Sequence, residues 1–124
     1  MATADVRAYL QTRISNAAER CYYGVAQDSA EYPFVAWNLE LVAMESGLSL
    51  EELEVDVIDY GTDSSEVERI ADDLTAILDH HYALEPAFQA AIYLERRQPI
   101  QENDKSIIRR RLTFQVRLHE RSST

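Results

Sequence analysis

The sequence contains a single cysteine, Cys21, which excludes an internal disulfide framework and a multi-thiolate metal site. We expect its thiol to be a small buried side chain at the end of a helix. Three glycines leave little material for a glycine-rich phosphate loop. No apolar run approaches the roughly 18 residues that a bilayer crossing needs. Residues 1–10 lack the basic start and apolar centre of a signal peptide, so we expect a cytoplasmic protein with no membrane partner.

The composition is typical of a folded globular protein, with 46% hydrophobic and 27% charged residues. The chain of 124 residues has the size of one domain, and no repeat or linker divides residues 1–124. Its formal net charge of −10 argues against nonspecific binding to nucleic acid or an anionic membrane. Residues 28–85 carry 16 acids and one base, whereas residues 86–124 carry four acids and eight bases. This asymmetry is a hint about binding partners.

The first half of the sequence predicts a helix followed by a hairpin. Residues 3–20 carry apolar side chains at helical spacing, with charged residues on the other side. Residues 22–33 have no clear period, so we expect a loop. Apolar and polar residues alternate in residues 34–45 and in residues 49–60, as in strands with one buried face. The turn signal Ser46-Gly47 lies between them and predicts a long antiparallel hairpin.

The second half repeats this order. Residues 63–81 carry the strongest helical periodicity in the sequence, and Pro86 marks the break after that helix. Residues 90–95 alternate as a third strand, and residues 106–120 alternate as a fourth, with only Arg110 breaking the pattern. The expected fold is therefore α+β, an antiparallel four-stranded sheet with two helices packed on one face, in the order α-β-β-α-β-β.

The face of the predicted sheet away from the helices carries charges of both signs. One interpretation is cross-strand ion pairing inside one molecule, where exposed pairs contribute roughly 0–1 kcal/mol each. The other is that acidic and basic rows meet on neighbouring copies, in a head-to-tail contact that can close into a ring. Both stay open for the candidate interface residues, which are Glu52, Glu54, Asp56, Arg109, Arg111 and Arg117, with Glu95 and Arg97 on the third strand.

No arrangement typical of catalysis or metal binding occurs in the sequence. His80 and His81 are adjacent in the predicted helix and point about 100° apart, so they cannot converge on one ion. Asp72 and Asp73 are likewise adjacent and do not form the facing carboxylate pair that hydrolysis requires. In the arginine run at residues 109–111, Arg110 faces away from its two neighbours in a strand, and the surrounding protein is acidic, which argues against nucleic-acid binding. We expect no enzyme, cofactor or metal.

Five segments of the sequence, taken together in their order along the chain, give a further indication of function. They are an opening amphipathic helix, Glu31-Tyr32-Pro33-Phe34-Val35, Val55-Asp56-Val57-Ile58, the amphipathic helix of residues 64–81, and Leu112-Thr113-Phe114-Gln115-Val116. Their order, with the Tyr-Pro-Phe-Val entry to the first strand, resembles the tail terminators (tail-to-head joining proteins) of long-tailed bacteriophages and related prophage or minor tail proteins. The resemblance covers nearly the entire chain. The first hairpin departs from shorter versions because it is long and acidic.

The resemblance implies a structural protein of the virion at the junction of tail and neck, present in the host cytoplasm during assembly. It implies a six-membered ring that stops polymerisation of the tail tube and presents a surface to head-completion or neck proteins. A lumen lined by carboxylates would repel passing DNA without binding it. The candidates for this lumen or for a subunit contact are Glu52, Glu54 and Asp56. The candidates for a contact with acidic neighbours are Arg109, Arg111 and Arg117.

Two other functions stay open from the sequence alone. A protein–protein adaptor outside viruses would form no closed ring and bind no tail-tube protein. A small hydrolase that holds a divalent ion with its acidic residues would show a higher melting temperature when metal is added. A six-fold species that weakens with salt would favour complementary charged edges, and hence the ring.

Overall fold

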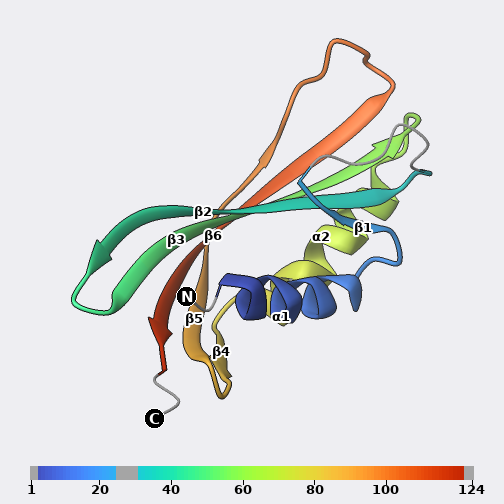
Figure 1. The fold of residues 1–124 in the computed structure, drawn as a ribbon. Helices are drawn as coiled ribbons and strands as arrows, with labels where there is room; N and C mark the ends of the chain where they lie inside the picture. The colour runs from blue at the N-terminus through green and yellow to red at the C-terminus, as the bar shows by residue number, and fades with distance from the viewer. Residues whose placement is uncertain (1–2, 25–30, 122–124) are drawn as a thin grey trace.

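The computed structural model describes residues 3–24 and 31–121 (Figure 1). Half of the loop predicted for residues 22–33, namely residues 25–30, therefore lies outside the described residues. The element order is α-β-β-β-α-β-β-β, with two helices and one six-stranded mixed sheet. This corrects the expected four-stranded antiparallel sheet. Two short strands that the sequence analysis missed, β1 (Cys21–Tyr23) and β4 (His81–Leu84), lie at the two edges, and β1 runs parallel to its neighbour.

The order of strands across the sheet is β1-β2-β3-β6-β5-β4. Four long strands correspond to the four that the alternation predicted: β2 (Phe34–Glu45), β3 (Leu48–Tyr60), β5 (Phe88–Pro99) and β6 (Ile107–Glu120). They are antiparallel to one another, with β3 and β6 side by side at the centre. The β2–β3 hairpin extends beyond the helices at one end of the sheet, and the β5–β6 connection extends at the opposite end (Figure 1).

Both helices, α1 (Thr3–Ser15) and α2 (Ser65–Leu78), lie on the same face of the sheet, called here the inner face (Figure 1). Among the described residues, neither has the length and apolar character to cross a membrane. Burying each large apolar side chain contributes roughly 1.5–3 kcal/mol, which fixes both helices on the sheet. The buried core includes Leu10 and Ile14 of α1, Leu74 of α2, and Trp37, Leu53, Leu112 and Phe114 of the sheet.

Helix α1 ends at Ser15, five residues before the predicted end at residue 20. Two backbone N–H groups after Ser15 donate to carbonyls three residues earlier, which tightens the chain into a turn. The carbonyl of Arg20 then accepts a hydrogen bond of 2.8 Å from the N–H of Val35. This bond draws the next residues alongside β2. Cys21 therefore begins a half-buried strand and does not lie at the end of a helix.

Helix α2 ends at Leu78, although the apolar periodicity continues to residue 81. His80 adopts a left-handed backbone conformation, with φ of 56°, and turns the chain out of the helix. The carboxylate of Asp79 accepts a hydrogen bond of 2.8 Å from the N–H of Leu94 in β5. His81 thus becomes the first residue of an edge strand, because the sheet supplies a partner that the sequence pattern does not reveal.

Candidate protein-interaction surface

The two edges of the sheet are only partly covered by other strands. β1 pairs with residues 35–37 of β2, so the backbone of residues 38–45, called here the β2 edge, has no strand beside it in the described chain. At the opposite side, β4 pairs with residues 89–92 of β5. Residues 93–99, called the β5 edge, likewise have no strand beside them in the described chain, although the N–H of Leu94 donates to Asp79. An uncovered strand edge is a template for pairing with another chain. The sheet therefore offers two candidate contact sites, one on each side.

The β2 edge carries exposed apolar side chains near the hairpin tip. Leu41, Val42 and Met44 expose 50%, 58% and 66% of their surface. A bulge at Val42 shifts the register, so Met44 lies on the inner face and Ala43 does not. A groove of about 520 Å³, called the hairpin groove, lies there beside the first turn of α1. Clustered exposed apolar surface of this kind marks a contact site. The apolar walls of the groove are Val6, Leu39, Leu41, Met44 and Leu118.

Glu51 of β3 lines the hairpin groove, and one of its carboxylate oxygens has no hydrogen-bond donor within the described residues. Its Oε2 atom is buried and accepts no hydrogen bond from the described residues. Burial, and secondarily the negative charge of Glu120, raise the pKa of Glu51. A buried acceptor without a donor costs about 1–3 kcal/mol. The groove therefore favours a partner that brings an apolar stem and an N–H donor, above all a cationic one.

On the outer face of the sheet, away from the helices, Asp56 of β3 holds two arginines of β6. Asp56 lies opposite Arg111 in the register and is 5% exposed. Its carboxylate accepts hydrogen bonds from Nε of Arg109 at 3.0 Å and from Nε of Arg111 at 2.9 Å. The Nη2 atoms of both arginines donate to the same carboxylate. The bond to Asp56 also raises the pKa of Arg111. This is the intramolecular pairing that the first interpretation predicted.

Two further carboxylates complete this network. Glu102 in the β5–β6 connection accepts a hydrogen bond of 2.7 Å from Nη1 of Arg109. Oε1 of Glu54 lies 3.1 Å from Nε of Arg111. Both arginine side chains are about three-quarters buried, because they are 28% and 27% exposed. Four of the six candidate interface residues are therefore engaged inside one molecule.

Glu52 and Arg117 are the candidate residues outside the network. Glu52 is half-buried on β3 and forms no ion pair within the described residues. Arg117 is exposed, donates to Gln115 at 3.3 Å and lies over the ring of Tyr93. The outer face around Arg117 is more apolar than predicted, since the nearby Leu84 exposes 71% of its surface. Whether any of the six candidates contacts another chain stays a prediction.

Arg97 lies on the inner face, which corrects its expected place beside Glu95 on the outer face. A bulge after Leu94 shifts the alternation by one residue. Arg97 consequently forms ion pairs with Glu68 at 3.1 Å and with Asp72 at 2.7 Å, both on α2. Arg110, which broke the sequence pattern, also lies on this face and donates to Glu68 at 2.8 Å. These two arginines attach α2 to the sheet.

Two cations of the described chain form no hydrogen bond, ion pair or ring contact. They are Arg96 on the β5 edge and Lys105 in the β5–β6 connection, and both are exposed. The other ten of the 12 lysines and arginines have partners of this kind. The bulge that moves Arg97 inward leaves Arg96 on the outer face, opposite Thr113. A free cation therefore stands at the edge of the sheet away from the acidic hairpin.

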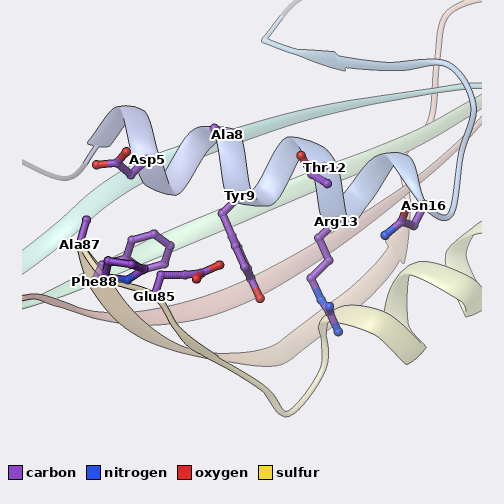
Figure 2. A pocket seen from close by; sticks show the side chains of 10 residues that line it. Asp5, Ala8, Tyr9, Thr12, Arg13, Asn16, Glu85, Ala87 and Phe88 are labelled. Carbon is purple, nitrogen blue, oxygen red and sulfur yellow. The ribbon is translucent and has the colours of Figure 1, made fainter.

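A second concave region, of about 580 Å³, lies between α1 and the β4–β5 turn (Figure 2). Tyr9 points from α1 toward β4, where its hydroxyl is 2.5 Å from Nε2 of His81 and the two rings stack. Arg13 donates to the carbonyl of Ile77 at 2.7 Å. Burial, and secondarily the charge of Arg13, lower the pKa of His81. Tyr9 and Arg13 of α1 thus bond to His81 and Ile77, and these contacts join α1 to the end of α2 and the start of β4.

The adjacent histidines weighed for metal binding diverge in the structure. His81 is half-buried against Tyr9, whereas His80 is exposed and lies 3.1 Å from Asp79. Within the described residues, no three histidine, cysteine, aspartate or glutamate side chains gather as metal ligands would.

The sequence analysis missed Glu51 and the apolar hairpin tip, although the sequence contains a signal for each. Consecutive strand residues face opposite sides of a sheet, so Glu51 and Glu52 cannot both lie on the outer face. Leu41 and Val42 are apolar neighbours in a strand of alternating residues, which indicates a bulge or an exposed apolar side chain. Neither signal says how far the helices extend along the inner face. The extent of the helices determines whether they cover Glu51.

Comparisons with known proteins identify a fold and no family. No protein-family model matches the chain, and no curated protein matches it. A solved structure that matches is a chain of the virion of a native gene transfer agent particle. The two folds agree with a TM-score of 0.70 over 90% of each chain, at 14% sequence identity. At this identity the likeness shows a shared fold.

Proposed function

We propose that the chain is a structural protein of a virion and acts as a tail terminator. In this role six copies form a ring that caps the tail tube and joins it to the head-completion or neck proteins. The observation that carries the proposal is the fold likeness to a virion chain, which spans 90% of both chains. The resemblance of the sequence segments to tail terminators supports the same function from independent information.

The arrangement of the sheet edges supports a ring. A ring of identical subunits needs a head-to-tail contact between two different surfaces of the molecule. The β2 edge and the β5 edge lie on opposite sides of one sheet, and within the described residues no strand pairs with them over eight and seven residues respectively. Because the two edges differ in charge and apolar character, a contact between them has one direction. Repetition of such a contact closes a ring when the rotation between neighbours permits.

The charges of the hairpin support an acidic lumen. Asp56 and Glu54 are neutralised by arginines, so they contribute little to such a surface. Glu40 and Glu45 are exposed on β2, and neither they nor Glu52 form an ion pair within the described residues. Carboxylates of this kind repel DNA that passes through the ring. The proposal includes no catalytic step, no cofactor and no membrane partner, and it places the protein at the junction of tail and neck after assembly in the host cytoplasm.

The test is a tube-capping experiment with the full chain. Purified protein is added to polymerising tail-tube protein of the same virion, and electron microscopy measures the length of the tubes and the density at their ends. We expect shorter tubes that carry a ring at one end. Tubes of unchanged length without a terminal ring would overturn the proposal. A melting temperature that rises on addition of Mg²⁺ or Mn²⁺ would contradict it in favour of a metal-dependent hydrolase.

Two lysine substitutions distinguish the loss of a contact at the hairpin tip from the general effect of an added positive charge. Met44→Lys places a cation on the exposed hairpin tip, where we expect it to weaken capping without unfolding the chain. Ala76→Lys adds the same charge to an exposed position on α2 and serves as the control. Equal capping by the two variants would show that the hairpin tip is not a contact.

A further inference from the structure

We infer that two surfaces of this chain bind each other in adjacent copies, the hairpin groove of one copy and the β4 patch of the next. The β4 patch is the part of the outer face formed by Tyr82 and Leu84 of β4 with Tyr93 of β5. The inference rests on the proposed ring function and names the contact that joins the subunits of the ring.

The β4 patch is an apolar surface at one side of the sheet. Leu84 and Tyr82 expose 71% and 63% of their surface, and Leu84 is the most exposed large apolar side chain of the described residues. The hydroxyl of Tyr93 donates to that of Tyr82 at 3.1 Å, and the two rings meet edge to face. Exposed aromatic and aliphatic side chains that gather in this way are typical of a contact between proteins.

The hairpin groove is an apolar surface that can receive this patch. Leu41 and Met44 are exposed at the groove, and Leu39 and Leu118 form part of its walls. Its volume of about 520 Å³ falls within the range of pockets that enclose small organic molecules. The groove can therefore accept a side chain as large as leucine or tyrosine from another molecule.

The groove and the β4 patch lie at the same end of the sheet. Leu48, beside the hairpin tip, pairs with His119 of β6, and His119 pairs with Gln89 of β5. Gln89 pairs in turn with Leu84 of β4. This row of residues crosses the sheet from the hairpin to β4, near the point where β6 ends (Figure 1). A second copy placed alongside in the same orientation therefore brings its β4 beside the hairpin of the first.

The contact is an overlap of two faces and not a pairing of strand edges. The groove opens on the inner face, where Met44 lies, whereas Leu84 lies on the outer face. When the hairpin of one copy lies over β4 of the next, the inner side of the hairpin faces the outer side of β4. The hairpin can reach over a neighbour because it extends beyond the helices (Figure 1). Since β2 and β4 lie on opposite sides of the sheet, the overlap repeats in one direction.

Charge on the two surfaces is complementary. Among the described residues, Glu51 and Glu120 line the groove with one cation, Arg121. Arg117 and His119 are exposed beside the β4 patch, and no carboxylate of the described residues lines it. Residues 34–60 contain no lysine or arginine, so two hairpins repel each other. Attraction between unlike surfaces and repulsion between like ones favour a head-to-tail contact.

Two substitutions, one in each surface, test the contact in the full chain. Met44→Lys and Leu84→Lys change side chains that are 66% and 71% exposed, so neither should unfold the protein. Each is expected to weaken self-association at least about tenfold in analytical ultracentrifugation, because each removes an apolar side chain from the contact. Tyr60→Lys makes the same kind of change at the opposite end of β3 and should stay within about threefold of the wild type. Association of wild-type strength in both Met44→Lys and Leu84→Lys would overturn the inference.

A mixture of the two variants tests whether the two surfaces bind each other. The Met44→Lys chain keeps an intact β4 patch, and the Leu84→Lys chain keeps an intact groove. The mixture should therefore form one-to-one heterodimers at concentrations where each variant alone is monomeric. Native mass spectrometry distinguishes these heterodimers by the different masses of the two chains. A mixture that associates no more than the separate variants would overturn the inference.

A cross-link identifies the partners directly. In a mixture of Met44→Cys and Leu84→Cys chains, a short bismaleimide should join position 44 of one chain to position 84 of the other, as read from the linked peptides by mass spectrometry. A predominant link between position 44 of two chains would overturn the inference in favour of a two-fold contact of hairpins. A wild-type chain that stays monomeric at every concentration would overturn it as well.

Tube capping is measured separately, so that failure of the contact and failure of the proposed function are distinguishable. Capping by a chain whose association ignores Met44 and Leu84 would overturn the inference and leave the proposed function in place. Association that depends on both residues, in a chain that does not cap tubes, would support the contact and overturn the function.

Discussion

Asp56→Asn removes one negative charge from between two arginines while keeping the shape of the side chain. Removing one member of a buried ion pair costs roughly 3–5 kcal/mol. Arg109 and Arg111 are 28% and 27% exposed and retain Glu102 and Glu54, so water and these carboxylates offset part of the loss. We therefore expect the free energy of unfolding to fall by about 2–3 kcal/mol.

Urea denaturation followed by circular dichroism gives this quantity, and the slope of the transition should not change because the core is untouched. For a domain of this size, the loss corresponds to a fall in melting temperature of about 10 °C. Glu40→Gln removes the same charge from an exposed position on β2 and should stay within about 0.5 kcal/mol of the wild type. Equal stability of the two variants would refute the view that Asp56 anchors the outer face.

Three single titratable groups give further predictions. Folding raises the pKa of Glu51, so its stabilising contribution is present below 4.5 and is lost as the pH rises through the folded value. Glu51→Gln should therefore raise the melting temperature at neutral pH but not near pH 4, and a lower value at neutral pH would contradict this. Folding lowers the pKa of His81, so its contribution is present above 6.5 and is lost as the pH falls. His81→Phe should flatten the melting temperature against pH below 6.5, and an unchanged profile would count against a buried neutral ring. Burial raises the pKa of Cys21 to about 11 from 9.0, so iodoacetamide should alkylate the folded chain about 100-fold more slowly than the urea-unfolded chain, and equal rates would exclude burial.

The sequence predicted three of the four long strands well because each has one buried face, whereas the predicted residues 90–95 cover half of β5. The bounds 34–45 agree with β2, and the predicted residues 49–60 and 106–120 differ from β3 and β6 by one residue at the start. In each of these strands, apolar residues must alternate with polar ones to fill the core. Short edge strands carry no such constraint. β1 has three residues and β4 has four, so tertiary pairing decides their conformation.

Tertiary pairing also explains why both helices end before the residues that the sequence pattern predicts. Residues 16–20 and residue 81 continue a helical pattern of apolar side chains, but hydrogen bonds from the sheet are available to them. The carbonyl of Arg20 pairs with Val35, and Asp79 pairs with Leu94. The periodicity of a segment gives no information about hydrogen-bond partners that lie far away in the sequence.

The candidate surface was only partly predictable for a related reason. The sequence shows rows of charges, but a single bulge moves Arg97 to the helices and leaves Arg96 outside. The pairing of Asp56 with Arg111 depends on the register of two strands 55 residues apart in the chain. A buried acceptor such as Glu51 appears only when the extent of the helices is known.

Native mass spectrometry of the full chain at low and moderate salt tests the central claim most directly. Self-assembly through the two opposite edges of the sheet, with charged residues on both, predicts a closed six-subunit species that dissociates as salt screens the contact. A chain that remains a monomer, or forms only a two-fold dimer, at every concentration and salt would contradict the account.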